Sequence, residues 1–300
     1  MQRKGVMYAI GAYMTWGLFP IYWKRLEGVP AGQLIAHRIV WSFILLCLVI
    51  ITTRQARAVR AALNPRILTT YLVAALLISV NWYTYVWAVT HHRVVEASLG
   101  YYINPLFSVL LGVLIFREKL RPFQWIPLIV AALGVLFLTL TYGTPPWVAL
   151  VLAATFGLYG MLKKTAPLSS LWGLSLETGL LFLPALAYLI FAEAIGRGAF
   201  LHATVEADWL MVGGGVVTAV PLLLFASAAS RVPLSTMGIL QYLNPSMQFL
   251  LGVLAYHEAF SRSRLIGFGI VWAGLALFWA ESLYTRRASA GLPVPELGEG

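Results

Sequence analysis

The sequence predicts an all-α integral membrane protein with ten transmembrane helices, arranged as two five-helix repeats of inverted topology. Three observations lead to this fold class. The chain of 300 residues is 60% hydrophobic and only 11% charged, a composition far outside the average of soluble proteins. Its apolar residues fall in runs of roughly twenty, the length that crosses a bilayer core of about 30 Å. Finally, one long stretch of the sequence occurs twice.

The repeat is clearest around two Asn-Pro pairs. Asn104 and Pro105 recur as Asn244 and Pro245, a register of 140 residues (104 to 244) that continues through the apolar run after each pair. We therefore expect a first repeat over residues 1–142, a second over residues 143–287, and a disordered Gly/Pro-rich tail over residues 288–300.

Ten spans follow from the apolar runs taken in order, five in each repeat. An odd number of spans makes the second repeat begin on the opposite side of the membrane, which gives inverted topology. The first run follows Arg3 and Lys4, and because no small-residue cleavage site comes after it, we expect it to remain as a helix. The predicted spans cover residues 5–23, 33–52, 67–89, 97–116, 123–142, 147–162, 170–192, 209–229, 234–256 and 265–284.

The distribution of charge bears on orientation and on partners. The formal net charge is +10, but the basic residues lie mainly in short connections, so they indicate membrane orientation rather than nucleic-acid binding. Their excess on one side, including four arginines between residues 54 and 66, predicts that both termini are cytoplasmic. The single Cys47 excludes an intramolecular disulfide. We find no metal-ligand spacing, phosphate loop or hydrolase motif, and therefore predict no metal, no cofactor and no enzymatic activity.

A polar stripe is the first candidate site. It occupies one helical face in each repeat, since its members are spaced by three or four residues. Such a stripe faces the interior of a helix bundle, because uncovered amides in lipid are costly. It either lines a cavity or joins helices by hydrogen bonds. Its members are Tyr101, Asn104 and Ser108 in the first repeat, and Gln241, Asn244 and Gln248 in the second.

The two prolines of the repeat predict helix kinks. Pro105 and Pro245 lack an N–H, so the carbonyls of Tyr101 and Gln241, four residues earlier, lose their helical donor. In a membrane, such carbonyls are tolerated where protein or a water-filled cavity satisfies them. The kinks are therefore either a platform for a solute or an adaptation of helix packing.

Three ionisable residues inside predicted spans are candidates for function, because charge there is costly and often functional. Glu177 is either a site for a proton or a substrate amine, or the partner in an ion pair with a neighbouring helix. His37, which precedes it by 140 residues (37 to 177), is a second candidate for proton coupling, since its charge changes near neutral pH. Arg38 either extends outward to the interface or binds a substrate carboxylate.

Aromatic residues surround a further amide on the third span. Asn81 and Tyr85 lie one helical turn apart, with Trp82 between them. Together with Trp16, Trp82 forms either an aromatic wall for an amphiphilic or cationic ligand, or part of the interfacial packing. Glu118 and its repeat Glu258 lie at the ends of their spans, and we interpret both as end-capping residues.

Several motifs resemble a known family. The runs from Val86 to Ala88 and from Glu96 to Pro105, with the pairs His37-Arg38, Asn81-Trp82 and His91-His92, are similar to the RarD-type permeases. These belong to the EamA family of the drug/metabolite transporter superfamily. The resemblance implies a bacterial inner-membrane protein with two five-helix EamA repeats around a central cavity, related to exporters of amino acids, other metabolites or drugs.

The leading functional hypothesis is secondary-active transport of a small metabolite, such as an amino acid or an amphiphilic drug, with export as the expected direction. One repeat would rock against the other around a site near the midplane. The alternative is a membrane-embedded receptor or scaffold that binds a ligand without moving it. The expected partners are a small solute, the lipid bilayer and protons as a coupling ion. The predicted solute site comprises Trp16, Asn81, Trp82, Tyr85, Tyr101, Asn104, Gln241 and Asn244.

Overall fold

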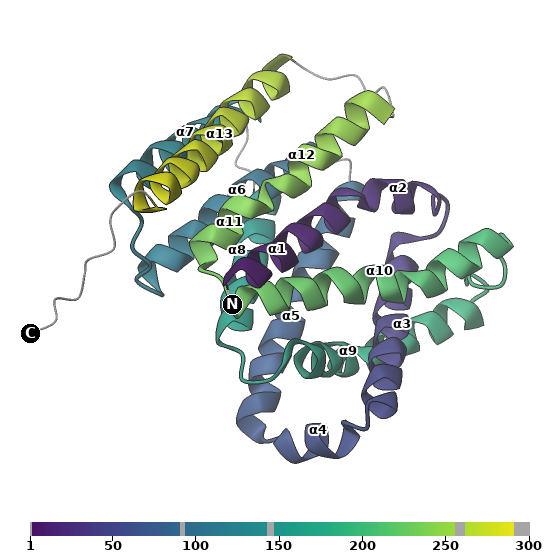
Figure 1. Ribbon diagram of the computed structural model, residues 1–300. Coiled ribbons are helices and arrows are strands. Elements are labelled where there is room, and N and C mark those ends of the chain that lie inside the picture. The colour runs from purple at the N-terminus through teal and green to yellow at the C-terminus, as the bar shows by residue number, and fades with distance from the viewer. Residues whose placement is uncertain (1, 91–93, 143–146, 256–261, 291–300) are drawn as a thin grey trace, which may run out of the picture. The chain divides into compact units, whose positions relative to one another are not determined.

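A computed structural model describes residues 2–90, 94–142, 147–255 and 262–290, and within these ranges the regular structure is entirely helical (Figure 1). In chain order the elements are α1 (Gln2–Gly17), α2 (Phe19–Lys24), α3 (Ala31–Thr52), α4 (Ala56–Ala62), α5 (Pro65–Thr90), α6 (Val94–Leu114), the 3-10 turn η1 (Pro122–Gln124), α7 (Trp125–Tyr142), α8 (Trp147–Thr165), α9 (Ser170–Ala194), α10 (Val205–Ala229), α11 (Leu234–Gln241), α12 (Leu243–Leu250), the π-helical turn η2 (Leu251–Ala255) and α13 (Arg262–Ala290).

Every predicted span falls largely on helical residues; the exceptions are Leu18, Ile115, Phe116 and Tyr242, which lie in turns, and residue 256, which lies outside the described part. Six segments of the described chain are long and apolar enough to cross a membrane, namely Ala31–Thr52, Pro65–Tyr85, Pro122–Leu140, Trp147–Thr165, Ser170–Ala194 and Val205–Ala229. Shorter apolar helices cover Leu99–Leu114 and Leu265–Phe278. The expectation of an all-helical membrane protein is confirmed, whereas the count of ten spans and their inverted arrangement stay predictions.

Two of the predicted spans are interrupted. The first span divides into α1 and α2 at Leu18, just before Pro20, and the ninth divides into α11 and α12 at Tyr242, just before Pro245. A proline near each break cannot donate a helical hydrogen bond. Pro105, by contrast, lies inside the unbroken helix α6. Equivalent prolines in the two repeats therefore have different local consequences.

The chain divides into two compact units, which we describe separately. The first, residues Met1–Glu118 and Pro146–Ala259, holds α1–α6 and α8–α12; the second, residues Lys119–Pro145 and Phe260–Gly300, holds η1, α7 and α13. Each unit contains residues from both sequence repeats. The repeat boundaries at residues 142 and 287 therefore follow from the sequence register and stay a prediction.

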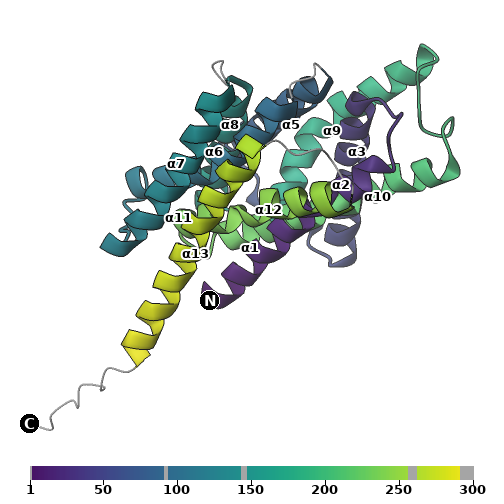
Figure 2. The ribbon, with the colours of Figure 1, turned by 90° about the horizontal axis from the view of Figure 1, so that it is seen from above.

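In the first unit the helices pack around one large apolar core. Helix α10 packs against α1 and α3, α6 against α8 and α11, and α3 against α9 (Figures 1 and 2). The core between them includes the fully buried side chains of Tyr13, Tyr159, Leu174, Leu234 and Met237. This packing holds the inner faces of α1, α6, α10 and α11 in fixed positions.

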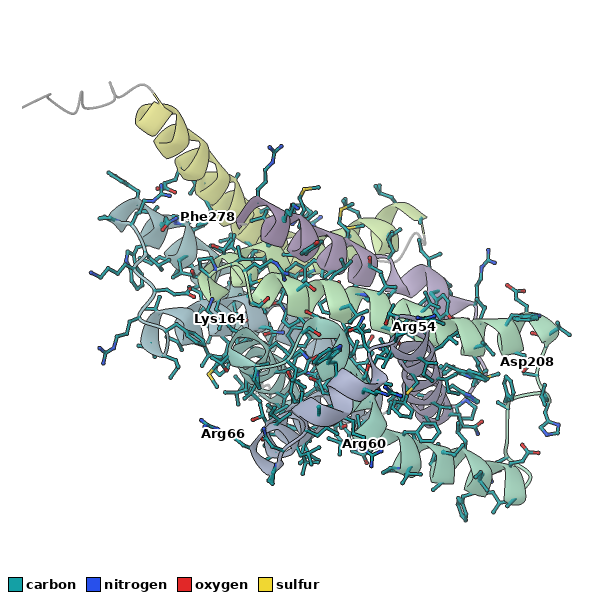
Figure 3. The ribbon with its side chains drawn as sticks, turned by 60° about the horizontal axis from the view of Figure 1, so that its bottom comes forward. Arg54, Arg60, Arg66, Lys164, Asp208 and Phe278 are labelled. Atoms are coloured by element: carbon teal, nitrogen blue, oxygen red, sulfur yellow. The ribbon has the colours of Figure 1, made fainter. Side chains whose placement is uncertain are left out.

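Polar residues concentrate at the helix ends of the first unit. The short helix α4, between α3 and α5, carries the exposed Arg60, and Arg66 follows at the start of α5. Asp208 lies in the first turn of α10, well away from these arginines (Figure 3). Acidic groups in a first turn complement the helix dipole. These charged residues thus lie at the ends of the apolar segments or between them.

The second unit is a pair of closely packed helices. Helix α7 runs against α13, and small residues allow the approach: a Cβ added at Gly134 would lie 2.9 Å from the Val271 side chain. A Cβ added at Gly274 would lie 2.9 Å from the carbonyl of Pro127. Small residues at helix contacts are typical of membrane proteins, because packing rather than apolar burial holds such helices together.

Candidate functional site

A cavity of about 220 Å³ lies inside the first unit. Side chains from α1–α3, α5, α6, α8 and α10–α12 contribute to its wall, so it is enclosed by helices from both sequence repeats. Its lining comprises Trp16, Phe19, Pro20, Trp23, Arg38, Ile78, Asn81, Trp82, Tyr85, Gly100, Tyr101, Asn104, Leu152, Phe156, Leu222, Gln241, Asn244 and Gln248. All eight residues of the predicted solute site are among them.

Five of the six residues of the polar stripe line this cavity, whereas the sixth, Ser108, is buried outside its lining. Asn104, Gln241 and Asn244 are all buried within the protein while lining it. The amide of Gln248 donates to Asn244 Oδ1 over 2.9 Å and to the carbonyl of Trp16 over 3.3 Å, which ties α12 to α1. The stripe therefore combines the two roles left open by the sequence, since some of its members also join helices.

Asn104 differs from the other amides in its hydrogen bonding. Only 4% of its surface is exposed, and its Oδ1 accepts no hydrogen bond from the residues that the structure describes. Asn81, in contrast, donates from Nδ2 to the carbonyl of Leu152 and to Thr155 Oγ1, each over 2.9 Å. A buried acceptor without a donor is costly. Asn104 thus lines the cavity while its own acceptor has no donor within the described structure.

Arg38 provides the positive charge of the cavity. Its Nε donates to Thr218 Oγ1 over 2.8 Å, and its guanidinium carbon lies 4.6 Å from the ring centroid of Trp82 and 4.9 Å from that of Trp23. Within the described ranges, it forms no ion pair with a carboxylate. Of the two alternatives for Arg38, its position in the cavity wall fits ligand binding better than extension toward the interface.

The aromatic residues of the cavity already face a cation. Trp23, Trp82 and Phe19 surround the Arg38 guanidinium, Phe19 with its ring centroid 5.9 Å from the guanidinium carbon. Trp16 and Phe156 pack edge to face on another part of the wall, with centroids 5.6 Å apart. The faces that a cationic ligand would need are therefore occupied in part by the protein's own arginine.

Glu177 lies outside the cavity lining, in a buried ion pair. Its Oε1 is 2.6 Å from Lys163 Nζ, and its Oε2 accepts from the Tyr159 hydroxyl over 3.0 Å. The side chains of Lys163 and Glu177 are only 3% and 2% exposed. These contacts correspond to the ion pair between neighbouring helices that was one of the two alternatives for Glu177.

His37 also lies apart from the cavity lining. It is buried beside Phe200, with ring centroids 5.1 Å apart, and neither ring nitrogen has a hydrogen-bond partner among the described residues. The pair His91-His92 and the repeated Glu258 lie outside the described residues.

Glu118 caps the start of helix α11, not the end of helix α6, which precedes it in the chain. Its carboxylate accepts from the backbone N–H groups of Leu234 and Ser235, over 2.7 and 2.9 Å, and from the Ser235 hydroxyl over 2.7 Å. Lys164 Nζ lies 3.5 Å away. Burial acts to raise the pKa of Glu118, but these hydrogen bonds and the Lys164 charge outweigh it, so the pKa is lowered.

Sequence reasoning missed two features of this region. Lys163, interpreted as part of a connection, is buried at the end of α8 as the partner of Glu177. A signal existed, since a carboxylate inside a predicted span requires a counter-ion. Trp23 and Phe19 were not singled out either. Their contact with Arg38 depends on the break between α1 and α2, for which Pro20 inside the predicted first span was a signal.

Comparisons with known proteins define the class to which this fold and cavity belong. Residues 3–140 match the EamA-like transporter family. The chain is 46% identical to Protein RarD of Streptomyces exfoliatus, over 96% of this chain and 92% of that one, and 46% identical to the uncharacterized transporter YojE of Bacillus subtilis (strain 168), over 96% and 97%. It is 37% identical to Protein RarD of Escherichia coli (strain K12), over 96% and 98%. These names indicate a membrane transporter or permease.

The class is therefore that of multi-pass bacterial membrane transporters. Within it, the chain belongs to the EamA-like transporter family and is of the RarD type. A solved crystal structure superposes with a TM-score of 0.71, covering 94% of this chain and 99% of the other at 18% sequence identity. That likeness shows a shared fold.

Proposed function

We propose that this protein is a secondary-active transporter that moves a small metabolite by alternating access, with the cavity of the first unit as its solute site. The observation that carries the proposal is the convergence of all eight predicted residues on one cavity. Asn104 comes from the first repeat, and Gln241 and Asn244 come from the second. A site shared between two repeats is suited to opening alternately toward each side.

Paired contacts support an inverted repeat of five helices in each half. A Cβ added at Gly17 would lie 2.7 Å from Met247, and one added at Gly157 would lie 2.5 Å from Phe107. Each of these four residues has its counterpart 140 positions away (17 to 157, 107 to 247). The Tyr242 hydroxyl likewise donates to the carbonyl of its own counterpart, Tyr102, over 3.2 Å. Contacts exchanged in this way are expected from a pseudo-two-fold axis.

The proposal extends to location and direction. The excess of basic residues at Arg3, Lys4 and between residues 54 and 66 supports an inner-membrane protein with cytoplasmic termini. Export of amino acids or amphiphilic compounds follows from the family resemblance. The two candidates for proton coupling, His37 and Glu177, both lie outside the cavity lining. The contacts of Glu177 support a structural role for that residue.

Solute counterflow in proteoliposomes tests the proposal. We expect the wild type to accumulate at least one solute from a pool of labelled amino acids and small metabolites, and Asn104→Ala and Asn244→Ala to lose that accumulation. Asn64→Ala is the matched control, because Asn64 also precedes a proline but is exposed. Accumulation that persists in both cavity variants would contradict the proposed site. Binding without counterflow would instead favour a receptor or scaffold.

A further inference from the structure

The charge of the cavity bears on the kind of solute that it takes. Its lining contains one cation, Arg38, and no Asp or Glu among the described residues. The neighbours of the guanidinium are a hydroxyl and aromatic rings, which leave its charge uncompensated. Arg38 is half-buried, and a cation held away from water without a carboxylate is costly, so it persists where something else provides the negative charge.

From this we infer that the solute is a small organic anion whose carboxylate pairs with Arg38, and the inference rests on the proposed transport function. Guanidinium groups pair with carboxylates through two parallel hydrogen bonds, and Nη1 and Nη2 of Arg38 have no hydrogen-bond partner among the described residues. The rings of Trp23 and Trp82, with centroids 4.9 and 4.6 Å from the guanidinium carbon, restrict the positions from which a carboxylate can approach it.

The remaining wall specifies the rest of the solute. Trp16, Phe156 and Leu222 offer an apolar surface to its body. Asn104 lines the wall, and its Oδ1, buried and without a donor within the described part of the chain, can accept from a hydroxyl or N–H group on the same molecule when the amide turns toward the cavity. The site therefore matches an amphiphilic carboxylic acid with one hydrogen-bond donor. An ammonium group finds no counter-ion in this lining, so a cationic amphiphile is disfavoured.

Binding of matched probes to the purified full-length protein in nanodiscs tests the inference. The probes share a phenyl body and differ in the head group: 3-phenylpropionate is an anion, 3-phenylpropanol is neutral and 2-phenylethylamine is a cation. We expect 3-phenylpropionate to bind about tenfold or more tightly than the other two, since a charged hydrogen bond is worth at least about this factor. Arg38→Gln is expected to abolish the preference, and Arg38→Lys to retain part of it.

The control variant is Arg60→Gln, the same change at an exposed arginine on α4 (Figure 3); it should bind like the wild type. The inference is overturned if 3-phenylpropionate binds no more tightly than the other two probes. It is also overturned if 3-phenylpropionate still binds more tightly to an Arg38→Gln variant whose melting temperature equals that of the wild type. Counterflow separates the two proposals. Arg38-dependent anion binding without counterflow would contradict transport alone, whereas counterflow of a neutral or cationic solute that Arg38→Gln leaves unchanged would contradict the anion alone.

Discussion

Two regions of the first unit occupy equivalent places in the repeat but differ in whether a charged side chain has a counter-ion. Trp23 and His37 in the first repeat correspond, 140 residues later, to Lys163 and Glu177 in the second. Lys163 and Glu177 neutralise each other in a buried ion pair. In the first repeat the cation is Arg38, which rests on Trp23 without a carboxylate in the described structure and lines the cavity.

The difference indicates how one repeated scaffold supplies both stability and a binding site. Where the chain provides its own counter-ion, as at Lys163 and Glu177, the two charges are paired and buried between helices, so a solute cannot reach them. Where an aromatic ring replaces the lysine and a histidine replaces the carboxylate, a neighbouring cation is left for an external partner. A functional site that is destabilising in the absence of its ligand is a common compromise.

The largest effect is expected at the buried ion pair. Lys163→Met leaves the Glu177 carboxylate buried between helices without a counter-ion. We expect this change to reduce the free energy of unfolding by about 3–5 kcal/mol. Denaturation of the purified protein in detergent measures this. The matched control is Glu206→Gln, which breaks the Arg25–Glu206 pair with side chains 67% and 63% exposed, and it should change stability by less than about 1 kcal/mol. Comparable losses in both variants would contradict a structural role for the buried pair.

Replacing Arg38 should have the opposite effect on stability. Arg38→Met removes a cation that has no carboxylate partner in the described structure, so the protein without solute should be equally stable or more stable by up to about 2 kcal/mol. The same denaturation measurement checks this. A loss as large as that of Lys163→Met would remove the distinction between the two regions.

Two of the cavity amides, Asn81 and Asn104, extend the comparison to uncharged groups. Asn81→Ala breaks two hydrogen bonds to α8 and should cost roughly 1–2 kcal/mol of stability, given the modest value of such bonds in membrane proteins. Asn104→Ala removes an acceptor that lacks a donor in the described structure, so it should affect solute binding more than stability. Thermal melting with and without solute measures both effects, and the reverse pattern would show that Asn104 is the structural residue.

The smallest effect concerns pH and Glu118. Because the folded pKa of Glu118 is lowered below its ordinary value of 4.5, its contribution is fully present above pH 4.5 and is lost as the pH falls through the folded pKa. Loss of this cap should cost about 1 kcal/mol. Melting temperatures between pH 7 and pH 3 should fall less steeply for Glu118→Gln than for the wild type. Identical slopes would show that Glu118 contributes nothing to the acid sensitivity.

The sequence was most informative where a pattern recurred. The spacing of Asn104 and Asn244 predicted a polar face in each repeat, and both residues line the cavity. The role of Arg38 was not accessible in this way, because its surroundings depend on where α2, which begins after the break at Leu18, places Phe19 and Trp23. The partner of Glu177 was missed since Lys163 lies at a span end, where a lysine ordinarily reaches the interface.

Side-specific labelling of the cavity tests the central claim most directly. The single native cysteine, Cys47, allows a Cys47→Ser background in which Ile78→Cys places a thiol in the cavity wall. Alternating access predicts that a membrane-impermeant thiol reagent modifies this cysteine from either side, and that bound solute slows the reaction. Leu48→Cys, at an exposed apolar position on α3, should resist the reagent from both sides. Modification of Ile78→Cys from one side alone, with and without solute, would contradict a transporter that opens alternately.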